Sequence, residues 1–443
     1  MEFTTTTESL TQRAARAIEL ARRFGADQAE AGVSVDEGLS VTVRLGELES
    51  VERQKDRGLA VTVYQAQRKG SASTSDFSER GIESAVRKAL SIASFTSADE
   101  YAGLADAELM AVDPPDLDLY HPWRLDVDRA AEIALEAENA ARALDARIDN
   151  SEGAVVSTGA GARAYANTHG FAGAYPTSSH SISCSVVAKA GGALERDYWY
   201  SAARAAEELE SPEAIGERAA RRALERLGAR QLGTRVAPII FPPELARGLF
   251  GHLVAAIRGT SQYRKASFLL GARGERIFPA WIDIREDPLI PRAAASAPFD
   301  GEGVATAPRE LVAAGILQGY VLSSYSARRL NLGTTGNAGG IHNLLVAANA
   351  GPLETIVAGC GEALLVTELL GQGANTVTGD YSRGAAGFWV EKGRIAYPVN
   401  EVTIAGNLRE IFQRIEAIGS DVDSRGAVRV GSVLIGGLTI AGA

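Results

Sequence analysis

The N-terminal part of the chain pairs a helical pattern of apolar residues with a strand-like one. Apolar side chains recur at helical spacing from about residue 10 to residue 24, where Gly25 can end the helix. A second helical pattern covers 78–95, with Ser78 as the expected N-cap. Between them, glycines or an Asp-Glu pair separate short runs of alternating apolar and polar residues, which predict an antiparallel meander over 31–38, 39–46, 58–67 and 69–76.

The same order of patterns recurs further along the chain. A helix is predicted from about Asp126 to Leu144, short strands follow within 161–192, and another helix covers 211–230. The acidic, proline-bearing segment 105–123 before this repeat is expected to cross the surface as a loop. The repetition predicts an α+β N-terminal domain, an antiparallel sheet with helices built from two meander-plus-helix units.

The pattern changes near residues 231–234, so we expect two domains, an N-terminal one over 1–232 and a C-terminal one over 233–443. Beyond an opening helix, short strands and glycine-rich turns dominate, which predicts a β-rich C-terminal domain. The apolar run at 430–443 is too short to span a membrane and is broken by glycines. We therefore expect it to form a buried pair of strands.

Composition and charge narrow the classes of function. With 46% hydrophobic and 23% charged residues, the sequence is that of an ordinary globular protein. The 45 Lys and Arg residues are outnumbered by 55 Asp and Glu residues, and the net charge of -10 argues against binding to nucleic acid. The N-terminal residues lack the positive and apolar regions of a secretory signal. We expect a cytoplasmic protein without a membrane anchor.

Two glycine-rich segments partly match sequence motifs that bind phosphate groups. Gly159, Gly161 and Ala164 match the dinucleotide pattern G-x-G-x-x-A, which needs a helix directly after the glycines to face the phosphates. The residues that follow are turn-rich and strand-like, so we interpret the motif as a turn. The loop 333–343 lacks the Gly-Lys-Ser/Thr of a nucleotide-binding loop. It is interpreted as backbone that lies close to an extended partner.

Few side chains suited to metal binding or nucleophilic catalysis are available, since the chain has five His and two Cys. Cys184 alternates with apolar residues in a predicted strand and Cys360 lies near glycines, so both are expected to be buried. His252 lies at the border of the apolar stripe of the helix within 242–259. It has no His four or five residues away and no adjacent Glu, so the local pattern favours a packed or hydrogen-bonded histidine.

Several segments resemble a known family, namely 36–64, 300–330, 334–340, 378–408 and 432–442. The resemblance extends over essentially the whole chain. Together the segments resemble the TldD/PmbA family, and specifically its PmbA (TldE) branch. The resemblance implies a paired system. In it, a TldD-type subunit carries zinc on an H-E-x-x-x-H helix with a distant Cys ligand, and a TldE-type subunit assembles with it but lacks the metal site. Such complexes are cytoplasmic and cleave unfolded or extended peptides.

Placed on this sequence, the zinc helix of the family falls on residues 247–252. Arg247 stands at the first His position and Gly248 at the Glu position, so only the second His is retained, as His252. Segment 421–432, where the TldD branch has its Cys ligand, contains no Cys. Residues five positions apart on a straight helix point about 140° away from each other, so a shared metal would also need a distorted helix. We interpret this helix as vestigial: the chain is expected to hold no catalytic residue, metal or cofactor, and zinc is expected in the TldD-type partner.

The resemblance thus predicts a non-catalytic subunit that forms a heterodimer with a TldD-type chain, completes the peptidase chamber and binds an extended peptide. The expected cleft residues are Gly336, Asn337 and Gly340 in the glycine-rich loop, and Asp380 and Arg383 in a turn. A structural role in turns stays open for all of them, and Arg383 could pair with Asp380 alone.

Two alternatives stay open. A homodimeric metallopeptidase could act alone if folding brought His342 or Glu362 to His252 as further ligands. Stoichiometric zinc and peptide cleavage by the isolated chain would favour it. A regulatory binding protein without a proteolytic partner is the other alternative. Repeated failure to recover an H-E-x-x-x-H subunit with this chain would favour that one.

Overall fold

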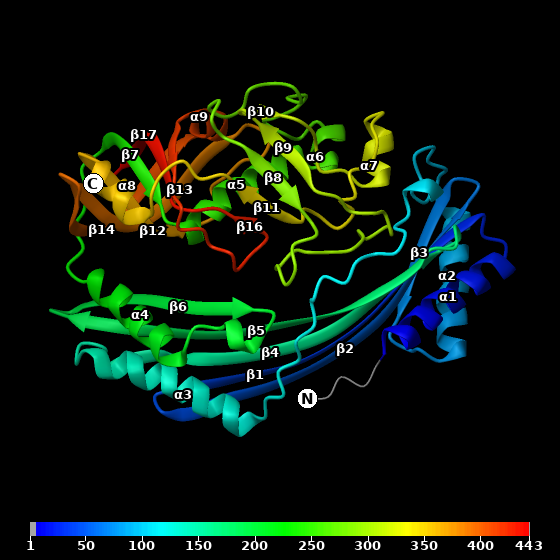
Figure 1. Cartoon of the computed structure of the whole chain (residues 1–443), viewed down its shortest axis with the longest axis horizontal. Helices are drawn as coiled ribbons and strands as arrows, with labels where there is room; N and C mark the ends of the chain where they lie inside the picture. The colour runs from blue at the N-terminus through cyan, green and yellow to red at the C-terminus, as the bar shows by residue number, and fades with distance from the viewer. Residues whose placement is uncertain (1–5, 443) are drawn as a thin grey trace.

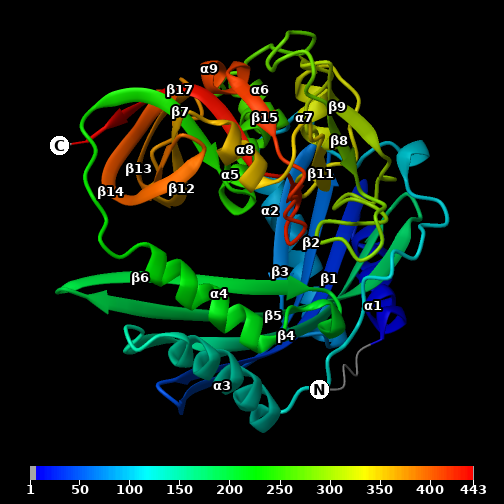
Figure 2. The ribbon, with the colours of Figure 1, turned by 60° about the vertical axis from the view of Figure 1, so that its left-hand side comes forward.

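The chain forms two layers that face each other. In the computed structural model, which describes residues 6–442, a long curved sheet from the N-terminal half lies below, and the C-terminal half lies over its concave side (Figure 1). Figure 2 shows the same arrangement from a second direction, with strands β12, β13 and β14 of the C-terminal half above β4, β5 and β6. The predicted α+β class is confirmed, with an N-terminal antiparallel sheet and a β-rich C-terminal half.

The curved sheet joins two meanders of three strands each. Its order is β3-β2-β1-β4-β5-β6, and every neighbouring pair is antiparallel. The strands are β1 (Gln28–Arg44), β2 (Glu47–Gln65), β3 (Arg68–Thr74), β4 (Asn150–Asn167), β5 (Ala172–Ala190) and β6 (Ala193–Ala203). The two predicted units are therefore present, and the pairing of β1 with β4 fuses them into one sheet.

The strands of this sheet are longer than the sequence pattern predicts. The Asp36–Glu37 pair does not turn the chain, because β1 continues through it with Asp36 opposite Asp56 on β2 and Gly161 on β4. Every second residue from Val33 to Val41 stays on the side of the sheet that the helices cover. The polar residues between them face the concave side, so the prediction of short strands was wrong.

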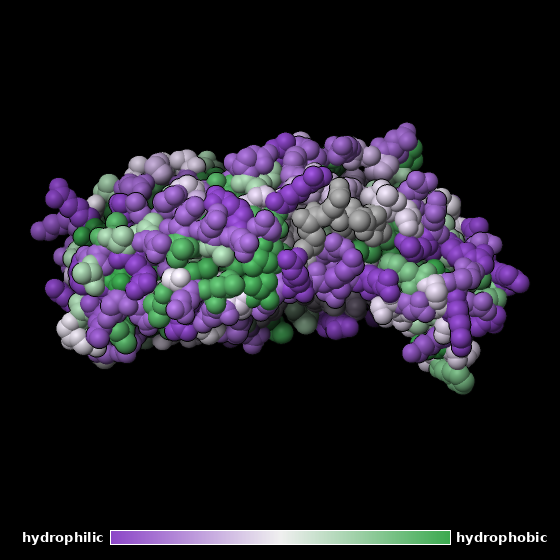
Figure 3. Space-filling view, turned by 90° about the horizontal axis from the view of Figure 1, so that it is seen from below, coloured by the Kyte–Doolittle hydropathy of each residue, from purple (hydrophilic) through white to green (hydrophobic). Residues whose placement is uncertain are grey.

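Two pairs of helices cover the convex face, one pair at each end, and each pair has its own apolar cluster. They are α1 (Thr7–Arg23) with α2 (Glu79–Phe95), and α3 (Val127–Leu144) with α4 (Pro212–Glu225). The predicted N-cap is confirmed, since Oγ of Ser78 accepts from N of Gly81 at 3.1 Å. Seen from below, this side is mostly hydrophilic, and hydrophobic residues gather mainly in the half where α3 lies (Figure 3).

The connections carry little regular structure. The segment 105–123 crosses the surface as predicted and contains one short 3₁₀ helix, η1 (Ala107–Leu109). A second one, η2 (Ala206–Glu208), leads into α4. The chain then passes to the C-terminal half through 226–234, where the expected domain boundary falls.

The G-x-G-x-x-A motif lies inside β4, so its interpretation as a turn was wrong. Gly159 and Gly161 are paired with β1 and β5 on either side. A Cβ at Gly161 would lie 2.2 Å from Oδ1 of Asp36. The small residue therefore makes room for a neighbouring side chain on the concave face, and no helix follows it.

The C-terminal half contains a barrel and a smaller sheet. In the first, β14 pairs with both β13 and β17, which closes the order β14-β13-β12-β7-β17 into a ring, and β15 extends it at β17. Its strands are β7 (Arg235–Phe241), β12 (Glu362–Leu370), β13 (Asp380–Glu391), β14 (Arg394–Asn407), β15 (Ile415–Ile418) and β17 (Val433–Ala441). The ring encloses much of the largest apolar cluster.

The smaller sheet has the order β10-β9-β8-β11-β16. Its strands are β8 (Ile284–Asp287), β9 (Arg309–Ala313), β10 (Ile316–Leu317), β11 (Asn343–Val346) and β16 (Val428–Arg429). The helices of this half are α5 (Pro243–Ile257), α6 (Gly259–Tyr263), α7 (Ser324–Arg329), α8 (Leu353–Gly359) and α9 (Leu408–Gln413). Short elements and long loops thus place many backbone segments above the curved sheet.

Two further predictions concern buried segments. The apolar C-terminal run forms one strand, β17, with an irregularity between Ile435 and Leu438, and not the expected pair of strands. The glycines there shift the register without reversing the chain. Cys184 and Cys360 are buried as predicted, and burial raises the pKa of the Cys184 thiol to about 12. No helix within residues 6–442 is long and apolar enough to cross a membrane.

Candidate functional site

Helix α5 contains residues 247–252, on which the resemblance places the zinc helix. Pro243 opens it, which a first turn tolerates because the missing N–H would have no partner there. Its apolar stripe is buried in the core of the C-terminal half, through Ala246, Leu249, Phe250, Leu253, Val254, Ala256 and Ile257. His252 lies half-buried at the border of this stripe, as the sequence predicted.

His252 packs against an aromatic ring and a cation. Its imidazole stands edge-on to the ring of Tyr381, with centroids 5.9 Å apart. Burial, followed by the positive charge of Arg383, lowers the pKa of His252 below its ordinary value. The ring is therefore neutral at pH 7, but its neighbours are a phenol and a guanidinium and not further metal ligands.

Arg247, at the first His position, is held by two groups from different layers. Its Nη1 donates to Oη of Tyr200 on β6 at 3.0 Å and lies 3.7 Å from Oδ2 of Asp423. Gly248, at the Glu position, has open space where a side chain would be. The helix thus presents a permanent cation and a gap where zinc chemistry needs an imidazole and a carboxylate.

The segment 421–432, where the resemblance places a Cys ligand in the TldD branch, contacts α5 through Asp423 and Arg247. It brings Asp423, whose two oxygens accept from Nε and Nη2 of Arg425 at 2.9 Å and 3.0 Å. Burial opposes ionisation of Asp423, but the hydrogen bonds and charge of Arg425, together with the charge of Arg247, outweigh burial and lower its pKa. Asp423 is thus an anion shared by two arginines.

Arg425 connects this ion cluster to the curved sheet. Its guanidinium lies 4.4 Å from the ring centre of Trp199 and 4.2 Å from that of Tyr200. Its Nη1 also donates to the backbone oxygen of Tyr200 at 2.6 Å. Arg247, Asp423 and Arg425 therefore join the two layers beside α5.

The residues at this place do not fit a zinc ion. A tetrahedral site needs three or four N, S or O donors, and of residues 247, 248 and 252 only His252 has a side chain that could bind zinc. Within residues 6–442, no three His, Cys, Asp or Glu side chains gather as a group that could hold a metal. Asp423, the carboxylate beside Arg247, is already bound to two arginines.

The ligands considered for a stand-alone peptidase lie elsewhere. His342 is buried in the loop before β11, and its Nε2 is 2.9 Å from the backbone oxygen of Gly336. Glu362 is exposed at the start of β12, opposite Glu391 on β13. Neither belongs to the contacts described around His252.

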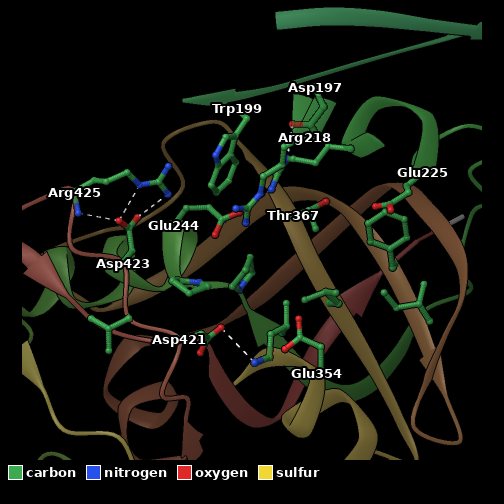
Figure 4. A pocket seen from close by; sticks show the side chains of 18 of the residues that line it. Asp197, Trp199, Arg218, Glu225, Glu244, Glu354, Thr367, Asp421, Asp423 and Arg425 are labelled. Carbon is green, nitrogen blue, oxygen red and sulfur yellow. Dashed lines mark hydrogen bonds and ion pairs between the residues drawn. The ribbon is translucent and has the colours of Figure 1, made fainter. Parts of the chain in front are cut away.

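A cavity of about 510 Å³ lies beside the ion cluster, between the two layers (Figure 4). Ten charged side chains line it, and five of them form ion pairs with one another. Arg222 lies 3.0 Å from Asp197 and 2.8 Å from Glu244. Trp199 donates to Glu210 and carries the guanidinium of Arg218 over its ring at 3.5 Å. This cavity is therefore the edge of an internal network of charges.

A larger cleft, of about 750 Å³, separates the concave face of the sheet from loops of the C-terminal half. Its floor comes from β1, β2, β4 and β5, and its roof from the loops 294–301 and 338–342. A neighbouring hollow of about 490 Å³ continues along the same strands and shares Thr177 and Arg204 with it. Together, the cleft and the hollow follow β1 from Gly32 to Ser40. These eight residue steps give a combined length of roughly 26 Å at about 3.3 Å per step.

The glycine-rich loop that roofs the cleft is fixed from behind. Nδ2 of the buried Asn337 donates to Oε1 of Glu286 at 2.8 Å and to the backbone oxygen of Gly340 at 3.0 Å. Its Oδ1 accepts from Nη2 of Arg309 at 3.0 Å. Glu286, itself buried, also accepts from Nε of Arg309 and from N of His342. Asn337 therefore holds the loop internally, whereas Gly340 lines the cleft.

The conformation of this loop requires glycine. Gly336 has a φ of +67°, and a Cβ there would lie 2.9 Å from the backbone oxygen of Ala305. Gly340 has a φ of +131°, which other residues rarely adopt. The sequence interpretation of backbone close to an extended partner stays a prediction, but the loop does turn its backbone toward a cleft.

Asp380 and Arg383 are the first and fourth residues of β13, and not part of a turn. Three steps apart in a strand, they point to opposite faces, so the ion pair considered between them does not form. Oδ2 of Asp380 accepts from Oγ1 of Thr378 at 2.6 Å. Nη2 of Arg383 donates to the backbone oxygen of Leu369 at 3.3 Å, beside His252. Their contact with substrate stays a prediction.

The sequence patterns did not point to the charged residues that line the cleft. Arg163 lies on β4 opposite Ser34 on β1, and Asp300 lies in the roof. Asp300 accepts from N of Glu302, Val304 and Ala338, yet burial raises its pKa to about 6. The polar residues at every second position of β1 and β4 could have pointed to them, because such a run indicates that this face of the sheet is exposed to solvent.

Three family models match the chain in sequence. They are "PmbA/TldA metallopeptidase domain 1" over residues 29–93, the "central domain" of the same family over 120–227, and its "C-terminal domain" over 234–442. Together they cover most of the chain, including α5, the segment 421–432 and the loops over the cleft.

Individual proteins match at full length. "Metalloprotease PmbA" of Escherichia coli O157:H7 is 48% identical over 433 residues, which cover 98% of this chain and 96% of that protein. A "Metalloprotease PmbA homolog" of Haemophilus influenzae is also 48% identical, over 436 residues, with the same shares covered. A crystal structure of a "putative modulator of DNA gyrase" from Bacteroides thetaiotaomicron has a TM-score of 0.93 at 26% identity and covers 99% of this chain and 100% of that one. The crystal structure of TldE from Thermococcus kodakarensis, at 21% identity and a TM-score of 0.86, shares the fold, covering 97% and 100%.

Proposed function

Because the chain belongs to the PmbA/TldD metallopeptidase family, in its PmbA (TldE) branch, we propose that it is the non-catalytic subunit of a cytoplasmic TldD/TldE-type peptidase. It forms a heterodimer with a TldD-type chain, which supplies the zinc and the general base. This chain completes the chamber and holds an extended peptide for cleavage by its partner.

One observation carries the non-catalytic role: the positions that hold zinc chemistry in the TldD branch are joined here by an ion cluster. Arg247 and Asp423 come from the helix and the segment that would supply ligands, and they interact with each other. A guanidinium at this place repels a divalent cation, and the pairing of Asp423 with Arg425 removes the remaining anionic donor. Hydrolysis is therefore assigned to the partner.

The cleft supports the peptide-holding role. Gly32 on β1, and Gly58 and Ala60 on β2, line its floor and have small side chains or none. An extended chain can therefore approach the sheet closely. The roof is backbone-rich and rigidly fixed through Asn337. A length of roughly 26 Å suits about eight residues in an extended conformation. Binding through backbone and shape accommodates many sequences, which suits unfolded substrates.

The test is a cleavage assay with an unfolded protein as substrate. This chain and a TldD-type chain from the same organism are purified alone and after co-expression. We expect cleavage by the pair and none by this chain alone. In the control, Glu of the partner's H-E-x-x-x-H helix is replaced by Gln, which should abolish cleavage although the pair still forms. Cleavage by this chain alone, or equal cleavage by the partner without it, would contradict the proposal.

A further inference from the structure

The cleft carries unpaired positive charge although the chain as a whole is acidic. Arg163 is exposed on the floor of the cleft, and within residues 6–442 no carboxylate forms an ion pair with it. Arg204 lines the cleft as well, and its guanidinium donates to the backbone oxygens of Ser178, Ala293 and Ala294. The net charge of the chain is -10, so surplus cations in one cleft are a local feature.

The anionic groups around Arg163 do not neutralise it. Asp300, in the roof, directs its oxygens to three backbone N–H groups. Asp36 lies on the same face of the sheet, two residues along β1 from Ser34, the partner of Arg163, but no ion pair joins Asp36 to Arg163. The neighbouring hollow is acidic, because Asp36 and Asp56 line it and lie opposite each other, so the charge changes sign between Arg163 and Asp36.

The surroundings of Arg163 suit a planar anion. Its cross-strand neighbours are Ser34 on β1 and Tyr175 on β5, which both carry hydroxyl groups and line the cleft. Behind Tyr175 stands the ring of Phe299, with centroids 5.3 Å apart. A guanidinium beside an apolar wall binds a carboxylate more strongly than one in open water, because less water screens the charges.

We propose that the cleft recognises a carboxylate of the bound peptide, either its C-terminus or an acidic side chain, and that Arg163 contacts it directly. The inference rests on the proposed function, in which this cleft holds an extended peptide. The acidic residues of the adjoining hollow repel a carboxylate, so the order of charges also favours one direction of the peptide along the strands.

The test measures binding of fluorescent octapeptides of Ala, Ser and Gly to the isolated full chain by fluorescence anisotropy at low salt. One peptide has a free C-terminus and one Glu. In the others the C-terminus is amidated, Glu is replaced by Gln, or both changes are made. We expect the uncharged peptide to bind about 10- to 100-fold more weakly, the range of one charge-assisted hydrogen bond. Whichever single change reproduces the loss identifies the source of the carboxylate.

Arg163→Gln should remove this preference, and Arg163→Lys should retain part of it. Arg53→Gln is the matched control. Arg53 is exposed on β2 opposite Leu39, whose side chain faces the helices, so Arg53 lies on the convex face, away from the cleft. Asp36→Asn should strengthen binding of the acidic peptide. Thermal unfolding checks that Arg163→Gln is folded.

Three results would overturn the inference. Equal binding of charged and uncharged peptides would contradict carboxylate recognition and leave the proposed function standing. An equal loss in Arg163→Gln and Arg53→Gln would show that only the overall charge matters. Failure of every peptide to bind would contradict the proposed peptide-holding role and the inference with it.

Discussion

Two regions between the layers use charge in opposite ways. At α5 the charges are paired: Arg247 and Arg425 share Asp423, which is almost completely buried. In the cleft over β1 and β4, no carboxylate within residues 6–442 pairs with Arg163. Paired, buried charges hold a structure together, whereas an unpaired charge in an open cleft is available to a ligand. The ion cluster beside α5 thus has a structural role, and we assign a binding role to the cleft.

The largest effect is expected from breaking the ion cluster. Asp423→Ala leaves two arginines without their anion between the layers, and we expect the free energy of unfolding to fall by about 3 kcal/mol. Urea denaturation measures it. Asp56→Ala, at an exposed position on β2, should change stability by less than about 0.5 kcal/mol. Similar losses in the two variants would contradict a structural role for Asp423.

A smaller effect is expected behind the roof of the cleft. Asn337→Ala removes hydrogen bonds to Glu286, Arg309 and Gly340 and leaves buried polar groups unpaired. We expect a loss of about 2 kcal/mol, with faster hydrogen exchange in the loop 336–343. The exposed Gln54→Ala serves as the control. Unchanged exchange in the loop would show that Asn337 does not fix the roof.

The smallest effect concerns pH and His252. Burial, with the charge of Arg383, lowers the pKa of His252 in the folded state, so the unfolded chain takes up a proton first as the pH falls below about 6.5. Stability contributed by the neutral ring is present above that pH and is lost as the pH falls toward the lowered pKa. His252→Gln should therefore show a weaker decrease in melting temperature between about pH 7.5 and pH 5.5. An unchanged or steeper decrease would contradict a buried, neutral histidine.

The sequence could predict features that depend on neighbouring residues. The N-cap at Ser78 and the apolar stripe of α5 were found because caps and helical periodicity are local. The length of β1 was missed because Asp36 and Glu37 resemble a turn, although Asp36 merely faces the concave side. Long strands form here because partners far along the chain, such as Gly161, continue the ladder.

The candidate site shows the same division. The resemblance located Arg247, Gly248 and His252, but no pattern could show that Asp423 meets Arg247, since 176 residues separate them and only the fold brings them to 3.7 Å. Arg163 was missed because one arginine among small alternating residues forms no motif. Its significance comes from the absence of a partner, which depends on the tertiary structure.

The central claim, that this chain cannot hold zinc, is tested most directly by its metal content. The purified full chain is incubated with excess zinc, dialysed and analysed by mass spectrometry for metals, with a TldD-type chain treated in parallel. We predict substoichiometric zinc in this chain and about one ion in the TldD-type chain. One tightly bound zinc per chain, lost on His252→Ala, would contradict the account.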